Sequence, residues 1–279
     1  MQAYRSIMVH VPIGPGGDAH VALAADLADR CNARLTGIAA GCLRMPLATA
    51  DGGAALAQIV ASGEEDLQEA LHAAAGRFRA GLSPAMQDAA WRAFAEPPAL
   101  ALTREACGAD LLVLGRREDS ATARFHCSAD AGDLLMGAGR PVLVVPPQIR
   151  RLEARRAVVA WTDTRESRRA VADAVPLLQQ CENVRVLEIC GHADAAAPAA
   201  RRTREVAGYL RQHGIKAAGD ALQLGEATIA DQLLAALELV DGDLIVAGGY
   251  GHTRLREWIF GGVTQALIRR APCCCLLSR

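Results

Sequence analysis

Short, almost continuous apolar runs alternate with longer segments of helical apolar spacing along the entire sequence. In the first half we expect strands at 6–11, 34–40, 91–95, 110–115 and 141–145 and helices at 18–32, 64–82, 98–107 and 128–139, with a Gly/Ala-rich connection at 51–61. Strands that are apolar throughout are typical of parallel sheets covered on both faces, and right-handed crossovers leave few topologies. The pattern therefore predicts an α/β fold.

The second half repeats this order. We expect strands at 157–161, 184–189, 216–222, 243–247 and 273–277, and helices at 166–180, 197–212, 227–239 and 258–270. The segments 109–115 and 242–248 match as ADLLVLG and GDLIVAG. A chain of 279 residues that is 51% hydrophobic can hold about two domains. We interpret it as a fused duplication with domains at 1–147 and 154–279.

The charged segment 146–156 joins the two halves, and its paired prolines end the fifth strand. We expect a solvated connector there, with a docking patch as the alternative. The formal net charge of −1 and the pI of about 6.7 disfavour binding to nucleic acid or to an anionic membrane. We find no apolar run of the roughly 20 residues that span a membrane and no export signal, so we expect a cytoplasmic protein.

The nine cysteines include no C-x-x-C pair, and in a cytoplasmic chain they are expected to be reduced. Cys273, Cys274 and Cys275 are consecutive on an expected strand, where neighbouring side chains point to opposite faces. We therefore interpret them as buried strand residues, with a metal or redox site as the alternative. His126 and Cys127 form a second candidate for metal binding or nucleophilic chemistry, although a chance pairing is favoured because no third partner is visible.

A run of glycines begins directly after the expected strand at 243–247 and continues into the expected helix at 258–270. Gly248, Gly249 and Gly251 follow the strand at 243–247, and Gly261 and Gly262 precede Thr264. Glycine lets the backbone approach an oxyanion closely, and a helix start offers free N–H groups and the positive end of a dipole. The pattern indicates a phosphate cradle, with a simple tight turn as the alternative.

The spacing G-x-x-G-x9-G followed by Val263 and Thr264 closely resembles the ATP-binding signature of the universal stress protein family. The segment 158–166, VVAWTDTRE, is similar to the first strand of that family and the turn after it. The resemblance is weak before Ala109 and strong after Arg156. It implies two tandem, open, five-stranded parallel sheets of Rossmann-like (adenine nucleotide alpha hydrolase-like) type, packed through their fifth strands as an internal pseudo-dimer.

The resemblance also implies a stress-response module that binds ATP or ADP, with Mg²⁺ as a possible companion, in the second half. The site residues that it implies are Trp161, Thr162, Asp163, Ile189, Gly248, Gly251, His252, Gly261, Gly262, Val263 and Thr264. Trp161 stacks on the base or packs under the sheet, with packing favoured, and His252 touches a phosphate or is simply solvated.

Two departures from the family pattern qualify this interpretation. Thr162 stands where the family usually has Asp, so either Asp163 substitutes or the site loses a charge-assisted hydrogen bond, worth roughly 1.5 to 3 kcal/mol or about 10- to 150-fold in affinity. In the first half, the aligned loop carries Glu118, Asp130 and Asp133, which would repel phosphate. We therefore expect at most one nucleotide per chain.

Three functions stay open at this point. The first is a nucleotide-binding regulatory module; the second is a stress protein that has lost the nucleotide and acts through an unidentified protein partner. The third is an enzyme, such as an ATP-cleaving ligase or a slow ATPase. We assign no catalytic residue and no metal ligand, because no Ser-His-Asp order, carboxylate pair or spaced ligand set lies beside the loop. A homodimer of tandem chains is also possible.

Overall fold

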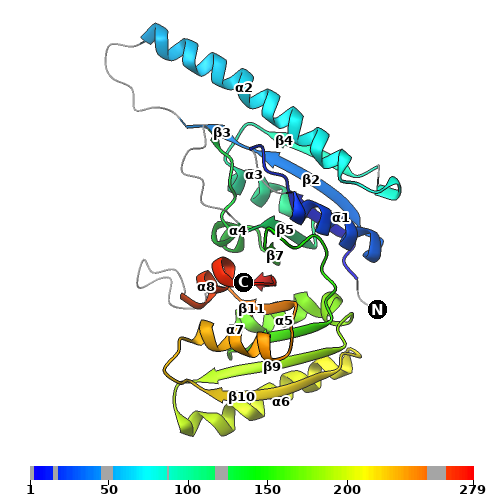
Figure 1. The fold of residues 1–279 in the computed structure, drawn as a ribbon, viewed down its shortest axis with the longest axis vertical. Helices are drawn as coiled ribbons and strands as arrows, with labels where there is room; N and C mark the ends of the chain where they lie inside the picture. The colour runs from blue at the N-terminus through cyan, green and yellow to red at the C-terminus, as the bar shows by residue number, and fades with distance from the viewer. Residues whose placement is uncertain (1–2, 15–17, 45–52, 87, 117–124, 250–261) are drawn as a thin grey trace.

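The computed structural model describes residues 3–14, 18–44, 53–86, 88–116, 125–249 and 262–279 (Figure 1). In the first half the strands are β1 (Ser6–His10), β2 (Arg34–Ala40), β3 (Cys42–Leu43), β4 (Ala90–Phe94), β5 (Leu111–Gly115), β6 (Phe125–His126) and β7 (Val142–Val145). The helices are α1 (Ala19–Cys31), α2 (Gly53–Ala80), α3 (Pro98–Glu105) and α4 (Ala131–Gly137), with short 3-10 turns at Pro84–Met86 and Ala106–Gly108.

The second half has the same order of elements. Its strands are β8 (Arg156–Ala160), β9 (Asn183–Cys190), β10 (Ala217–Gln223), β11 (Leu244–Gly248) and β12 (Cys274–Ser278). Its helices are α5 (Arg165–Leu178), α6 (Ala196–Gln212), α7 (Ile229–Leu239) and α8 (Gly262–Arg270), with a 3-10 turn at Ala193–Ala195. The predicted α/β alternation is confirmed.

Ten strands form one continuous sheet in the order β10-β9-β8-β11-β12-β7-β5-β1-β2-β4. Each half contributes five strands to this sheet, and these pair in parallel. From the outer edge of the sheet to its centre, the five strands of each half lie in the order third, second, first, fourth and fifth along the chain. The halves meet where β12 pairs antiparallel with β7, with Leu276 opposite Leu143. The predicted packing through the fifth strands is therefore confirmed.

Two apolar cores cover the opposite faces of this sheet. One contains residues of α1, α2, α5 and α6, and the other contains residues of α3, α4, α7 and α8. Successive strand residues alternate between them: Ile7 and Val9 belong to the first core and Met8 to the second. Because each strand is buried on both sides, near-continuous apolar runs are required.

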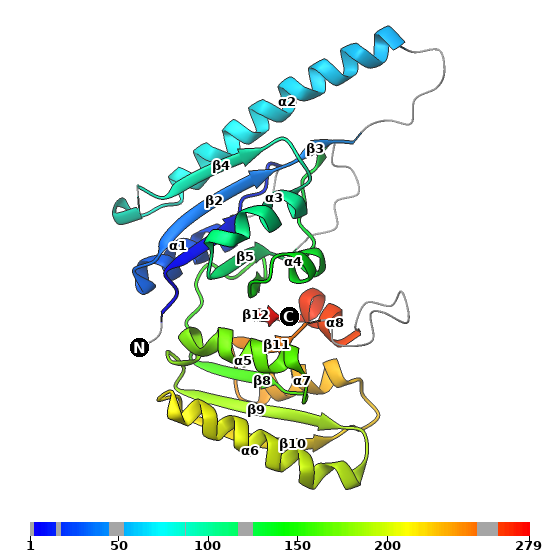
Figure 2. The same ribbon diagram turned by 180° about the vertical axis from the view of Figure 1, so that it is seen from behind.

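Two expectations about the first half are corrected. The segment at 51–61, expected as a connection, is helical from Gly53 onward, because its many alanines favour a helix more than its glycines oppose one. The N-terminal turns of α2 extend beyond the sheet (Figures 1 and 2), and Ile59 is 58% exposed. The short pair β3 and β6 was not predicted, since strands of two residues carry no periodic signal.

The connector between the halves is also different from the expectation of a solvated segment. Leu152 and Ala154 are buried within it, while Arg151 is exposed. Arg30 of α1 donates one hydrogen bond to the Leu152 carbonyl and another to Oε1 of Gln180, each 2.7 Å long. The connector is therefore an integral part of the junction, because its apolar residues alternate with its charges.

The position of β7 and β12 in the middle of the sheet predicts slow hydrogen exchange. We expect amides of Val142–Val145 and Cys274–Ser278 to exchange among the slowest in the native protein, because global opening is needed to expose them. Amides of the edge strands β4 and β10 should exchange faster. Exchange measured by mass spectrometry that showed the central pair to be as fast as the edges would contradict the arrangement.

Candidate functional site

In the second half, the candidate site lies where the strand order reverses. From β8 the chain continues to β9 and β10 on one side of β8, and it then crosses to β11 and β12 on the other side. The strand order therefore reverses at β8. Open α/β sheets bind ligands in the crevice at the carboxyl ends of such strands. Ala160 pairs with Leu187 of β9 and with Ala247 of β11, so the three strands end at one edge.

Most of the residues implied by the resemblance are found at this edge. Trp161, Thr162 and Asp163 follow β8, Ile189 lies near the end of β9, and Gly248 ends β11. Gly262, Val263 and Thr264 form the first turn of α8. Gly251, His252 and Gly261 lie outside the described residues.

The glycines that end β11 have packing roles. A Cβ on Gly248 would lie 2.6 Å from the backbone nitrogen of Ser167, so only glycine lets the first turn of α5 approach this strand. The N–H of Gly249 donates to the Ser278 carbonyl at 2.7 Å and is not free for a ligand. Any anion at this edge must therefore be bound by other groups.

The N-terminus of α8 offers such groups. The first N–H groups of a helix have no intrahelical partner, and the helix dipole places partial positive charge beside them. Gly262 is exposed, and a Cβ added there would meet no atom of the described residues within 4 Å. Thr264 is buried, with 6% of its surface exposed. The turn is thus open at Gly262 and closely packed at Thr264.

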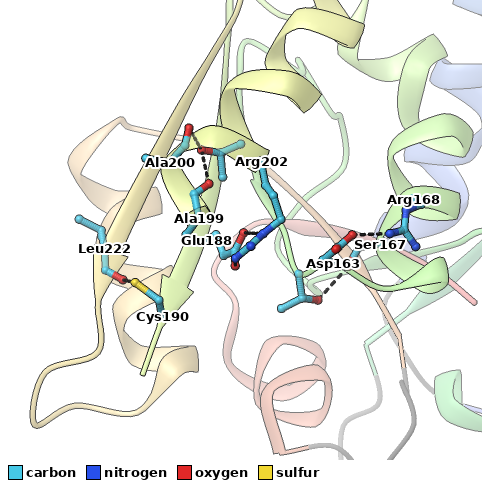
Figure 3. A network of polar contacts seen from close by, with 11 residues as sticks. Asp163, Ser167, Arg168, Glu188, Cys190, Ala199, Ala200, Arg202 and Leu222 are labelled. Atoms are coloured by element: carbon cyan, nitrogen blue, oxygen red, sulfur yellow. Dashed lines mark hydrogen bonds and ion pairs between the residues drawn. The ribbon is translucent and has the colours of Figure 1, made fainter. Parts of the chain in front are cut away.

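The structure also shows how Thr162 and Asp163 are used. The Thr162 hydroxyl lies 3.0 Å from the Ser167 hydroxyl, in hydrogen-bond contact. Asp163 is turned toward Arg168 and forms an ion pair with it (Figure 3), and both side chains are more than half exposed. The carboxylate of Asp163 is therefore engaged by Arg168 and does not replace the Asp that the family usually has at the position of Thr162.

Glu166 is the residue at this edge that the sequence did not single out. Its side chain is 2% exposed; Oε1 accepts a hydrogen bond of 2.7 Å from Nε of Arg165, and Oε2 has no partner among the described residues. Burial opposes its ionisation, but hydrogen bonds from Arg165, the backbone and Thr164 outweigh burial and lower the pKa. An acid in the first turn of a helix is so common that no signal in the sequence distinguishes Glu166.

Trp161 and Glu188 close the crevice on the side of α5 and α6. Trp161 is 7% exposed and packs in the core, and its Nε1 has no partner among the described residues. Glu188 of β9 binds Arg202 of α6 through both carboxylate oxygens (Figure 3), with Nε of Arg202 3.0 Å from Oε2. This hydrogen bonding raises the pKa of Arg202. On this side of the crevice the charge of Glu188 is therefore already compensated by Arg202.

The corresponding crevice of the first half is filled by the protein itself. The His20 ring packs on Gly115, where an added Cβ would lie 2.7 Å from Nδ1, and His20 Nε2 is 2.8 Å from the His10 carbonyl. Ile13 occupies the position equivalent to Asp163 and is 4% exposed. Little space is left for a ligand between these side chains.

The acids expected in the first half add to this difference. Asp130 caps α4, and its Oδ1 accepts hydrogen bonds from the N–H groups of Gly132, at 2.8 Å, and Asp133, at 3.2 Å. Asp133 is exposed in the same turn, and Glu118 lies outside the described residues. The N–H groups that would bind a phosphate are thus occupied by a carboxylate of the chain itself.

The other sequence candidates do not assemble into a site. None of the nine cysteines, all of which lie in the described residues, forms a disulfide. Cys274 and Cys275 are buried in β12, as expected for strand residues, and Cys273 is buried just before that strand. His126 is exposed in β6 beside Cys42 of β3. The part of the chain that the structure describes contains no cluster of three or more metal-ligating side chains. It also contains no helix long and apolar enough to cross a membrane.

Comparison with known proteins identifies the second half. Residues 153–279 match the family model described as the universal stress protein family. These residues form a universal stress protein domain. The domain includes the whole candidate crevice, from β8 to β12. No curated protein matches the sequence.

Solved structures extend the likeness in fold to the entire chain. A universal stress protein from Archaeoglobus fulgidus DSM 4304 has a TM-score of 0.70 at 16% identity, covering 100% of this chain and 97% of that chain. A putative universal stress protein from Pseudomonas aeruginosa UCBPP-PA14 has a TM-score of 0.57 at 15% identity, covering 99% and 93%. The TM-scores and the coverage show a shared fold, and at these identities they show the fold alone.

A half-length structure is known with a ligand. The universal stress protein from Archaeoglobus fulgidus in complex with dAMP is 20% identical to this chain, with a TM-score of 0.37. It covers 45% of this chain and 98% of its own. The bound ligand of that protein is an adenine nucleotide.

The filled crevice of the first half predicts a loss of stability in acid. Burial, with the nearby charge of His20, lowers the pKa of His10 to about 3, and burial also lowers the pKa of His20. The unfolded chain takes up protons below about pH 6.5, whereas folded His10 stays neutral until about pH 3. The free energy of unfolding should therefore fall as the pH falls from 6.5, by about 2 kcal/mol at pH 5 from His10 alone.

Urea unfolding at pH 8 and pH 5 measures this effect. The variant His10→Leu should lose less stability between the two pH values than the unmodified protein does. The variant His72→Gln replaces an exposed histidine of α2 and serves as the control. Equal pH dependence in His10→Leu and the unmodified protein would show that the buried histidine is not responsible.

Proposed function

We propose that this protein is a regulatory module of the stress response that binds one adenine nucleotide, ATP or ADP, in the crevice of its second half. The observation that carries the proposal is the first turn of α8, which lies at the strand-reversal crevice of a universal stress protein domain. The chain would then divide into a supporting domain at 1–147 and a nucleotide-binding domain at 154–279. Its nine cysteines, none of which forms a disulfide, suit the reducing cytoplasm.

In this proposal the phosphates bind at the start of α8. The free N–H groups of the first turn and the helix dipole favour an anion, and the Thr264 hydroxyl adds a donor. The open space at Gly262 lets the phosphate approach the backbone. Mg²⁺ would arrive bound to the phosphates, because the described side chains offer no ligand cluster of their own.

We assign the sugar end of the nucleotide to Glu166. A nucleotide can donate hydrogen bonds from its ribose hydroxyls and its base, while its phosphates repel a carboxylate. Glu166 has one buried oxygen without a partner among the described residues, and such an atom is costly to leave unsatisfied. Glu166 would therefore supply the charged acceptor that Thr162 cannot provide. Asp163 is paired with Arg168 and would not take this role.

The same residues argue for binding without rapid turnover. A general base works best when its pKa lies near the pH of the reaction. The pKa of Glu166 is lowered, and Asp163 is held in an exposed ion pair. Neither carboxylate is therefore suited to act as the general base that activates water. We propose a regulatory role in which the presence or absence of bound nucleotide is the signal.

The phosphate assignment predicts the effect of a single acid at the start of α8. The variant Gly262→Glu should weaken ADP binding by about 100-fold or more, because it places a carboxylate where the phosphate would lie. The variant should still fold, since Gly262 is exposed and a Cβ added there meets no atom of the described residues within 4 Å. Gly76→Glu, at an equally open position on α2, is the matched control and should bind normally.

Isothermal titration calorimetry with ADP or with ATP and Mg²⁺ measures both the affinity and the stoichiometry. We expect one site per chain in the unmodified protein. Two sites, or normal binding by Gly262→Glu, would show that the crevice is assigned incorrectly. An absence of binding in the unmodified protein would favour a stress protein that acts through a protein partner alone.

The assignment of Glu166 predicts a contrast with its neighbour Asp163. The variant Glu166→Ala should weaken binding by about 10- to 150-fold, because a charged acceptor is lost. Asp163→Asn should leave the affinity unchanged, because that side chain serves Arg168 at the surface. If 2′- or 3′-deoxy nucleotides lose affinity for the unmodified protein but not for Glu166→Ala, the ribose is the partner. A larger effect from Asp163→Asn than from Glu166→Ala would reverse the assignment.

A further inference from the structure

We propose that the first half of the chain acts as a built-in support for the phosphate-binding helix, with Arg116 as the positioning residue. The inference rests on the proposed nucleotide site, because it assigns the first half a role in shaping that site. It is carried by contacts across the junction that hold both ends of the segment from Gly249 to Ala271.

The first contact holds the C-terminal end of α8. Nη1 of Arg116, the residue that follows β5, donates a hydrogen bond of 2.7 Å to the Ala271 carbonyl. The N–H of Ala271 in turn donates to the Leu267 carbonyl at 3.0 Å, so Ala271 continues the hydrogen bonding of the helix. A cation at this end also complements the helix dipole.

The second contact holds the point where the chain leaves β11. Leu135 of α4 packs against Gly249, where an added Cβ would lie 3.2 Å from Cδ1 of Leu135. Gly249 and Leu135 are both buried. A third contact runs from Nε2 of Gln148, in the connector, to the Pro272 carbonyl at 3.4 Å. The first half thus contacts residues on both sides of the proposed phosphate site.

Among the described residues, the hydrogen bond from Arg116 has no counterpart donated from the equivalent position of the second half. The N–H of Arg116 donates to the Val145 carbonyl, and the N–H of Gly249 donates to the Ser278 carbonyl, each at 2.7 Å, so Arg116 and Gly249 occupy equivalent positions. Gly249 has no side chain that could reach back to α4. The first half therefore donates a hydrogen bond to the end of α8, and the second half donates no equivalent bond to the end of α4 from Gly249. This asymmetry is expected if the first half supports the site of the second.

The short length of α8 gives these contacts their importance. A helix of nine residues is unstable alone in water and depends on packing. Fixing its position before the ligand arrives reduces the ordering that binding must otherwise impose. We therefore expect the contact from Arg116 to stabilise α8 in the free protein and to tighten nucleotide binding.

The test compares three variants of the full chain. Arg116→Ala removes the contact, and Arg116→Lys keeps a cation that can reach the same carbonyl. Arg140→Ala is the matched control, because Arg140 also donates to a backbone carbonyl, that of Cys107, but within the first half. Each is measured by hydrogen exchange of the α8 amides without nucleotide, by calorimetry with ADP and by urea unfolding.

We expect Arg116→Ala to speed exchange in α8 by about tenfold and to weaken ADP binding by about tenfold. Arg116→Lys should recover part of both effects, and Arg140→Ala should show neither. Unchanged exchange in α8, or faster exchange spread evenly over the protein with a matching loss of stability, would overturn the inference. If the unmodified protein binds no ADP, the proposed function fails, while the exchange of α8 still tests the support separately.

Discussion

The antiparallel pairing of β7 with β12 is the interaction on which the rest of the structure depends. It turns two five-stranded sheets into one sheet of ten and buries two apolar strands that would otherwise be exposed edges, which tend to aggregate. The same pairing brings the two halves together beside the sheet: Tyr4, which precedes β1, donates to the Asp173 carbonyl of α5, and Arg30 of α1 donates to the Leu152 carbonyl of the connector. The site-supporting contact of Arg116 with Ala271 also exists only because the two strands are joined.

The crevices of the two halves have the same backbone topology but differ in the side chains that border them. In the second half, Gly248 allows α5 to approach closely, and the crevice is bordered by the open turn at Gly262 and by Glu166. In the first half, His20 fills the space beside Gly115, and Asp130 satisfies the N-terminus of its own helix. Packing and charge together explain why we propose a ligand for one half and a structural role for the other.

The sequence was sufficient for the architecture because buried parallel strands leave a strong signal. The runs at 110–115 and 243–247 were recognisable because each is apolar after its first residue, an aspartate, and their matching sequences revealed the duplication. The helix that begins at Gly53 was missed because its propensity comes from alanines in a segment that also looks like a loop. Glu166 could not be singled out, since its importance depends on burial and on an unpaired oxygen, which only the folded structure defines.

The equivalence of Arg116 and Gly249 has a consequence for symmetry. In a homodimer with a twofold axis, each residue appears on both sides of the interface, so a change that helps one site is imposed on the other. A fused chain escapes this constraint, and here it places an arginine on one side of the pseudo-axis and a glycine on the other. Fusion also makes the junction intramolecular, so its integrity does not depend on the protein concentration. The two halves of the duplicated chain could therefore diverge, so that one half supports α8 and the other binds the ligand.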